Sequence, residues 1–211
     1  MPDEYSTIQS AIDAAVEGDS VLVSADTYYE RIVWPETNGI KLIGSGEDDC
    51  IIYCNHQTSV IRFEEDLGGI IDSTTLITGF TIKNGNPQGD YPNDRGGGMY
   101  LSYSSPTLTN ITFSGNAATF ASVNSCGGGM FIGTSSPTLT DVTFIDNTAD
   151  RGGGMWLIAS SSPTLTGVTF IDNTATIMGG GMCLMNSSNS TLTNVSISGN
   201  TANSGGGMFL N

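Results

Sequence analysis

Basic residues are scarce in this sequence. It has 6 lysines and arginines against 21 aspartates and glutamates, which gives a formal net charge of −15 at pH 7. A chain this acidic is repelled by phosphate-rich partners, so we expect it to bind neither nucleic acids nor anionic membrane surfaces. The same acidity is typical of a secreted or salt-exposed protein that holds cations.

Long apolar runs and cysteine motifs are also missing. No run of about 18 apolar residues occurs and nothing resembles a signal peptide, so we predict no membrane insertion. The four cysteines show no CxxC pair and no metal-ligand spacing, and we therefore expect free thiols rather than a disulfide framework. The composition favours an extracellular or cell-surface location, with the signal peptide absent from this chain.

Glycine, in contrast, is abundant: the chain has 28, and they recur in triplets followed by methionine. The triplets begin at residues 96, 127, 152, 179 and 205, so they are 31, 25, 27 and 26 residues apart. The full repeats read GGGMYLSYSSPTLTNITFSGN (96–116), GGGMFIGTSSPTLTDVTFIDN (127–147), GGGMWLIASSSPTLTGVTFIDN (152–173) and GGGMCLMNSSNSTLTNVSISGN (179–200). A period in this range is typical of a solenoid, in which each unit buries its apolar face against its neighbours.

Apolar and polar residues alternate within each repeat, which indicates short strands rather than helices. In the first repeat, Met99 and Leu101 mark one strand, Leu108 a second, and Ile111 with Phe113 a third. The alternation is interrupted between the second and third strands by one residue of a type that tolerates a positive φ: Asn110, Asp141, Gly167 or Asn194. Three strands and a left-handed corner in each coil predict a parallel β-helix.

The repeats resemble the right-handed parallel β-helix of the pectin-lyase-like superfamily. Their GGGM and FxDN spacing is also similar to the GGA[ILV] and FxxN repeats of polymorphic outer membrane proteins, with Gly for Ala and Met for Ile. The resemblance implies an all-β fold, a right-handed parallel β-helix of three-strand coils. It implies no single activity, because this fold carries lyases, hydrolases, esterases, epimerases, adhesins and phage spikes.

We predict a single β-helix domain that spans the whole chain. Its parts are an N-terminal cap (1–19), irregular early coils (20–95) and the regular GGGM repeats (96–211). A capping box over 6–9, with Ser6 as the N-cap, and the apolar stripe after it predict an α-helix that covers the N-terminal end of the core. The last repeat stops partway through a coil, so we expect a fragment whose open C-terminal end favours end-to-end self-association.

Two insertions interrupt the coils at one edge. Residues 84–95 are rich in proline, glycine and polar side chains, which marks a loop. Residues 117–126 form a second insertion at the equivalent point of the next coil. Adjacent long loops are where a solenoid walls a binding site. Short strands of the early coils are expected at 21–23, 32–33, 40–43, 51–52 and 60–63.

The first strands of the repeats predict a strip of exposed rings. If the methionines face the core, the residues after them face solvent: Tyr100, Phe131, Trp156, Cys183 and Phe209. An exposed apolar strip usually marks a binding site, and rings with polar neighbours suit sugars, although strand residues of this type also pack along ladders. The candidate binding residues are therefore Tyr100, Phe131 and Trp156, with Asp90, Tyr91, Asp94, Arg95 and Arg151 from the segments beside the strip.

Threonines form a second regular pattern. They recur two residues apart in the second strand of every repeat, at 107 and 109, 138 and 140, 164 and 166, and 191 and 193. This array resembles the flat faces of β-helical ice-binding proteins. The simpler explanation is that threonine suits an outward strand position.

Groups suited to catalysis are few, and His56 is the only histidine. Chemistry of the pectate-lyase type would need carboxylates that hold Ca²⁺ and a Lys or Arg base. The nearest candidates are two Asp-Arg pairs that precede triplets, Asp94–Arg95 and Asp150–Arg151, and two aspartates expected to stack, Asp146 and Asp172. None matches a catalytic motif of the family, so no metal site and no cofactor are predicted, Ca²⁺ being the alternative. The sequence therefore favours a protein that is not an enzyme, and a polysaccharide lyase or hydrolase if it is one.

Taken together, the patterns predict an extracellular β-helix that presents a flat surface to a polysaccharide or to a cell-surface glycan in adhesion. The alternative is a polysaccharide-active lyase or hydrolase with its site beside the loops 84–95 and 117–126. A second alternative is ice binding through the threonine face.

Overall fold

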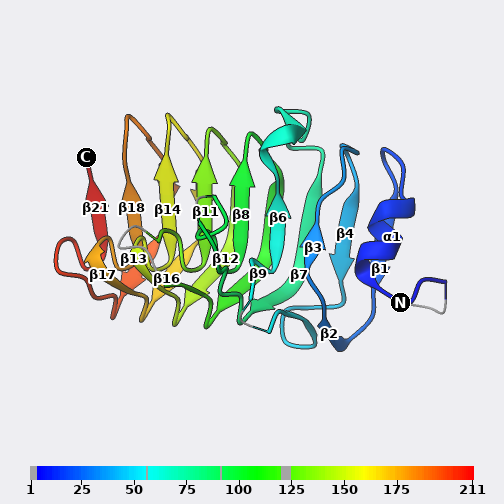
Figure 1. Ribbon diagram of the computed structural model, residues 1–211, viewed down its shortest axis with the longest axis horizontal. Coiled ribbons are helices and arrows are strands. Elements are labelled where there is room, and N and C mark those ends of the chain that lie inside the picture. The colour runs from blue at the N-terminus through cyan, green and yellow to red at the C-terminus, as the bar shows by residue number, and fades with distance from the viewer. Residues whose placement is uncertain (1–3, 56, 91, 120–124) are drawn as a thin grey trace.

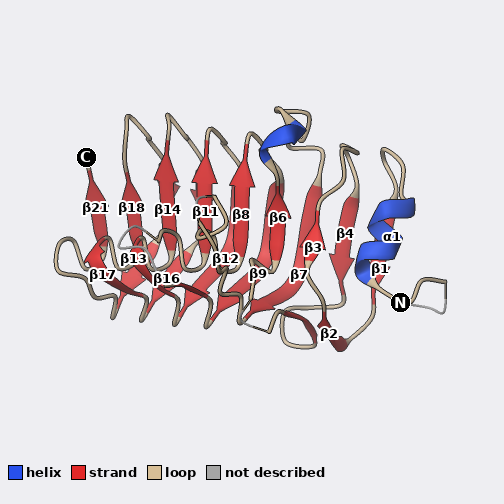
Figure 2. Cartoon of the chain, in the orientation of Figure 1, coloured by secondary structure: helices blue, strands red, loops and turns tan. Residues whose placement is uncertain are grey.

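The structure, a computed structural model, describes residues 4–211 except 56, 91 and 120–124. Its strands lie side by side along one axis, with the N-terminal helix at one end and the C-terminus at the other (Figure 1). All pairings between strands of successive coils are parallel. The predicted all-β parallel β-helix is therefore confirmed, and Figure 2 shows how little of the chain is helical.

The first strand of each coil contributes to a seven-stranded sheet. The methionine of each repeat lies in register with the methionine of the next, from Met99 to Met208. In spatial order the strands are β3 (Ile32–Val33), β6 (Ile61–Phe63), β8 (Met99–Ser102), β11 (Met130–Gly133), β14 (Met155–Ile158), β18 (Met182–Leu184) and β21 (Met208–Leu210).

The second and third strands of each coil form one long sheet that bends at a corner. The predicted corner residues all have positive φ, 49° at Asn110, 53° at Asp141, 65° at Gly167 and 53° at Asn194. This prediction is confirmed. The strands are β1 (Ser20–Val23), β2 (Asp26–Tyr29), β4 (Lys41–Gly44), β5 (Cys50–Tyr53), β7 (Leu76–Lys83), β9 (Thr107–Ser114), β12 (Thr138–Ile145), β15 (Thr164–Thr166), β16 (Thr169–Ile171), β19 (Thr191–Thr193) and β20 (Ser196–Ser198).

A third, smaller sheet was not predicted. The segments that return from the third strand to the next glycine triplet pair with one another in parallel. They form β10 (Ala117–Ala118), β13 (Thr148–Arg151) and β17 (Thr174–Met178). Among the described parts of the two insertions, only β10 is strand, and residues 84–95 contain none outside the undescribed position 91.

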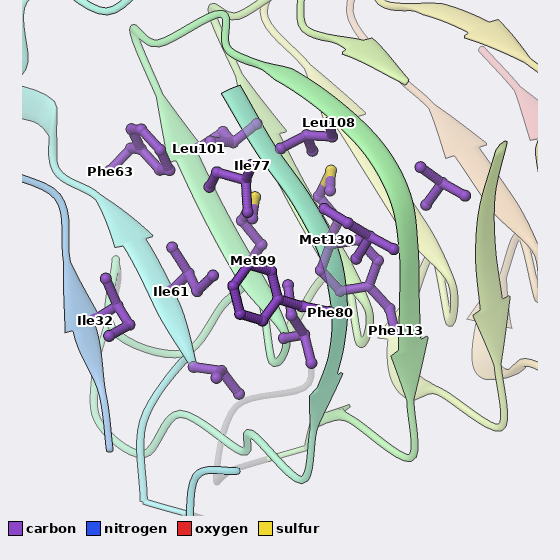
Figure 3. Packing of buried hydrophobic residues seen from close by; sticks show 14 of the residues in the cluster. Ile32, Ile61, Phe63, Ile77, Phe80, Met99, Leu101, Leu108, Phe113 and Met130 are labelled. Atoms are coloured by element: carbon purple, nitrogen blue, oxygen red, sulfur yellow. The ribbon is translucent and has the colours of Figure 1, made fainter. Parts of the chain in front are cut away.

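Buried apolar side chains of facing strands fill the core between the sheets (Figure 3), and within the repeats identical side chains stack from coil to coil. Phe113, Phe144 and Phe170 stack with ring centroids 4.9 Å apart, and the methionines from Met99 to Met182 are fully buried. The asparagines that end the third strands form a hydrogen-bonded ladder, in which each Nδ2 donates to the Oδ1 of the next: Asn116, Asn147, Asn173 and Asn200. Repetition of one sequence therefore produces contacts that repeat from coil to coil.

The N-terminal end of the core is covered by α1 (Ile8–Ala14), which buries Ile8, Ala11 and Ile12. The capping box begins one residue later than predicted: Thr7, not Ser6, is the N-cap, and its Oγ1 accepts from Ser10 N at 3.0 Å. The carboxylate of Glu30 accepts hydrogen bonds from the first two N–H groups of the helix, those of Ile8 and Gln9. The other helical element is the single turn η1 (Glu65–Leu67).

Candidate functional site

The predicted strip of exposed rings is buried. Tyr100 is 1% exposed, Phe131 and Trp156 are each 3% exposed, and Cys183 is fully buried. Together with Cys126 they form a second hydrophobic core outside the seven-stranded sheet, which we call the outer core. The prediction of solvent exposure was wrong, because residues that precede the glycine triplets, such as Cys126 and Met178, fold back over the strip.

The glycine triplets allow the segments that precede them to lie over the outer core. The first glycine of each triplet has a positive φ, for example 61° at Gly152. A Cβ at Gly152 would lie 2.9 Å from the Cβ of Trp156 and 2.4 Å from the carbonyl oxygen of Met155. Only glycine therefore lets the chain approach closely enough to bring Arg151 over the ring of Trp156.

All four arginines of the chain lie beside the outer core. The Arg62 guanidinium carbon is 4.2 Å from the ring centroid of Tyr100, and Arg62 is itself 1% exposed. Arg95 lies 5.2 Å from the ring of Phe131, and Arg151 lies 5.9 Å from the ring of Trp156. Arg31 contacts Glu64 at 3.8 Å, and Glu64 also pairs with Arg62. A strongly acidic protein thus places four of its six basic side chains along one flank.

The aspartates near this flank differ in their surroundings. Asp94 is buried, and its Oδ1 lies 3.4 Å from Arg95 Nε. The Asp150 carboxylate accepts from Thr176 Oγ1 at 2.7 Å and from Ser125 N at 3.3 Å. Asp90 is exposed in the loop, and Tyr91 lies outside the described residues. Five of the predicted site residues are therefore brought together as Arg-aromatic and Asp-Arg pairs: Arg95 with Phe131 and Asp94, and Arg151 with Trp156.

The two thiols of the outer core, those of Cys126 and Cys183, are buried and have raised pKa values. Burial raises the pKa of Cys126 to about 12, although Arg95 and Arg151 act to lower it. Burial likewise raises the pKa of Cys183 to about 12. All four cysteines are free, as predicted, and all four are buried, including Cys183, which was expected to face solvent. Because the thiolate is the reactive form, Cys126 and Cys183 are poor nucleophiles and poor metal ligands at neutral pH.

The structure offers no assembled catalytic or metal centre among the residues that it describes. In that part of the chain, no three His, Cys, Asp or Glu side chains are grouped so as to hold a metal ion. Asp146 and Asp172 are exposed residues with positive φ at a second corner of the coil. His56 lies outside the described residues. The lyase or hydrolase alternative therefore gains no geometric support from these side chains.

The threonine rows form a regular outward array. Thr107, Thr138, Thr164 and Thr191 pair in register, as do Thr109, Thr140, Thr166 and Thr193. Their side chains are half-buried in β9 and β12, whereas Thr164 of β15 and both threonines of β19 are exposed. The array is as predicted, and ice binding through it stays a prediction.

An aromatic pair with one exposed and one half-buried ring, which the sequence analysis did not predict, lies on another face. Tyr29 ends β2 and is 78% exposed, while Tyr28 beside it packs against the core. Tyr53 occupies the paired position of β5, with its ring centroid 5.3 Å from that of Tyr29 and the rings inclined by 57°. Asn84 Nδ2 donates to the Tyr53 hydroxyl at 2.9 Å. We call Tyr29, Tyr53 and Lys83, the next residue in the same row, the tyrosine platform.

Only weak sequence signals pointed to this pair. The segment Asp26-Thr27-Tyr28-Tyr29 shows no alternation of polar and apolar residues, and it lies in an early coil without the GGGM repeat. No recurring neighbour therefore indicated which tyrosine faces outward.

A comparison with protein families found that residues 31–211 match a family model described as a right handed beta helix region. No match was found among curated proteins, and none among solved structures. In the described part of the chain, the helices are too short or too polar to cross a membrane.

Proposed function

The chain belongs to the right-handed β-helix family, and on that premise we propose that it binds a polysaccharide or cell-surface glycan on the tyrosine platform. The family fold supports many activities, so the argument depends on the site rather than on the fold. The observation that carries it is the exposure of Tyr29, at 78%, on a strand whose neighbouring coil presents a second tyrosine in register.

The platform has the chemistry that a sugar requires. A tyrosine ring offers a flat apolar face for the C–H groups of a pyranose and a hydroxyl for its oxygens. The inclined rings of Tyr29 and Tyr53 leave an angled surface between them, and the amide of Asn84 fixes the Tyr53 hydroxyl from one side. An exposed ring of this size has little structural role, because its side chain contributes almost nothing to the core.

The row beyond the tyrosines favours a polymer over a single sugar. Along the helix axis, Tyr53 is followed by Lys83 and then by Ser114, each one coil further. With coils about 4.8 Å apart, the row from Tyr29 to Ser114 extends over about 14 Å. A linear glycan lying along the axis would stack on the tyrosines and place its next polar or acidic substituents against Lys83 and Ser114.

A glycan array and affinity electrophoresis with soluble polysaccharides test this proposal. We expect Tyr29→Ala to weaken binding about tenfold or more, which corresponds to about 1.4 kcal/mol. Tyr29→Phe should retain most of the affinity, because the ring face is kept. Both variants should leave the thermal transition unchanged.

Tyr103→Ala is the matched control, because Tyr103 is another exposed tyrosine, 46% exposed, in the turn after β8. It should bind as the unmodified protein does. Absence of any glycan ligand, or equal binding by Tyr29→Ala, Tyr53→Ala and the unmodified protein, would contradict the proposal.

A further inference from the structure

The outer core contains two buried donors without an acceptor. Within the described residues, neither Trp156 Nε1 nor Arg151 Nε has a hydrogen-bond partner, and both atoms are inaccessible to solvent. The two side chains are neighbours, since the Arg151 guanidinium carbon is 5.9 Å from the centroid of the Trp156 ring. Two unsatisfied donors therefore occur together on a residue that is 3% exposed and on the side chain above it.

Such a pair calls for a specific explanation. Buried polar groups in folded proteins are almost always paired, and an orphan commonly marks an ion or a water. Indole and guanidinium N–H groups can only donate. The missing partner of each must therefore be an acceptor, and because the two side chains are neighbours, a single group with several acceptor atoms can serve both.

The local charge favours an anion over a neutral acceptor. Arg62 pairs with Glu64, and Arg95 lies 3.4 Å from Asp94. For Arg151, no carboxylate of the described chain lies within ion-pair distance, because Asp150 beside it is held by Thr176 and Ser125. The buried Cys126 is neutral at pH 7 and supplies no compensating charge.

We propose that Arg151 and Trp156 form a binding site for an oxyanion, that is, a sulfate, phosphate or carboxylate group. Both N–H groups are closed to solvent as the side chains stand, so the partly exposed Arg151 side chain must turn outward before the group can enter and accept from its Nε and from the indole Nε1 beneath. The group belongs either to a free ion or to a substituent on a polymer. This site is separate from the tyrosine platform, and it stands without it.

The test measures the thermal transition and the tryptophan fluorescence of the full chain during titration with sodium sulfate or inorganic phosphate. Sodium chloride at equal ionic strength corrects for general salt effects, because sulfate stabilises most folded proteins by exclusion. We expect a saturable stabilisation and fluorescence change with the oxyanions. In Arg151→Gln the affinity should fall at least about tenfold, which is the loss of one charge-assisted donor.

Two variants control for charge and for the other site. Lys41→Gln removes one positive charge from β4 on the long sheet and should respond as the unmodified protein does. Tyr29→Ala should also respond fully, so that failure of the platform and failure of this site are distinguishable. Arg151→Lys, which keeps the charge but not Nε, should bind more weakly than the unmodified protein.

Dextran sulfate and neutral dextran separate the two sources of the group. A response to free sulfate that is lost in Arg151→Gln identifies a small-ion site. A response to dextran sulfate alone, lost in the same variant, identifies a substituent on a polymer. No saturable response to any of these probes, or the same response in Arg151→Gln, would overturn the proposal. An ordered water would then be the acceptor for the two donors.

Discussion

At the corner between the second and third strands, the side chain of Asp141 limits the space for a side chain at Gly167 in the next coil. A Cβ at Gly167 would lie 2.4 Å from the Oδ1 of Asp141 in the preceding coil. Gly199 has the same relation to Asp172, at 1.9 Å, on the second corner. A side chain at either position therefore needs that aspartate to turn away, in addition to the strain of the positive φ.

Gly167→Val should destabilise the protein by at least about 1–3 kcal/mol, because a β-branched residue is strained in the left-handed region. The clash with Asp141 adds to this strain. In the Asp141→Gly background the clash is absent, so the cost of Gly167→Val should be smaller there. Urea unfolding of the four proteins in this double-mutant cycle measures the coupling. Equal costs in both backgrounds would show that the contact carries no energy.

Trp156→Ala should lower the free energy of unfolding by about 3–5 kcal/mol, the usual cost of truncating a buried large side chain. Its ring fills the outer core between Phe131 and Cys183, so the cavity cannot collapse easily. Tyr29→Ala is the comparison, because it removes an exposed ring and should change stability by less than about 0.5 kcal/mol. Equal stability of the two variants in urea would contradict the assignment of an outer core.

Residue-level prediction succeeded where the determinant is local. The type of the corner residue reveals its φ, and strand alternation reveals that Met99 faces inward and Tyr100 outward. Burial of Tyr100 could not be deduced in this way, because it depends on segments that fold over the outer face. The exposure of Tyr29 was not predicted either, because nothing in the sequence distinguishes this residue from Tyr28, which packs against the core.

At the scale of elements, the asparagine ladder joins the ends of the third strands. Asn147 Nδ2 donates to the Phe113 carbonyl and to Asn173 Oδ1, each at 2.9 Å. Its own Oδ1 accepts from the backbone and the side chain of Asn116. One side chain thus satisfies the buried polar groups of three coils.

Asn147→Leu should destabilise the protein by about 1–3 kcal/mol or more, because partners in the coils on either side lose their bonds while buried. Asn200→Leu should cost less, because that residue is only partly buried at the last coil. Chemical denaturation of both variants gives the comparison, and hydrogen exchange at Asn116 N reports the local loss. A larger cost at position 200 than at 147 would contradict this account.

Element prediction was accurate for the repeats and less so elsewhere. The three strands of each coil and the N-terminal helix were predicted, the latter with its N-cap displaced by one residue. The strand β2 was missed because its outward tyrosine and half-buried residues break the apolar pattern. The sheet of β10, β13 and β17 was missed because short segments rich in alanine and threonine pair only when neighbouring coils bring them together.

At the scale of the whole molecule, the two ends differ. Helix α1 covers the N-terminal end of the core, whereas the last coil leaves Leu192, Ile197 and Leu210 at least 36% exposed. Edge strands with apolar neighbours readily pair with another chain. The two ends therefore differ in their capacity for association.

The polypeptide of residues 1–211 should self-associate through the β19–β21 end, with a dissociation constant that the double variant Leu192→Asp/Leu210→Asp raises at least about tenfold. Analytical ultracentrifugation over a range of concentrations measures this. Ser10→Asp on the polar side of α1, at the opposite end, is the control and should associate unchanged. An unmodified polypeptide that stays monomeric at the highest protein concentration measured would contradict the prediction.

The covered N-terminal end and the in-register stacking also set the order in which the coils can fold. Every coil finds its complete template in the coil before it, and the cap is synthesised before all of the coils that follow it in the sequence. Each new stretch of 25 to 31 residues can therefore fold as it is synthesised, without waiting for sequence still to come. Assembly of this protein would proceed from the capped end, and a nascent chain arrested between two glycine triplets would already hold all of its finished coils.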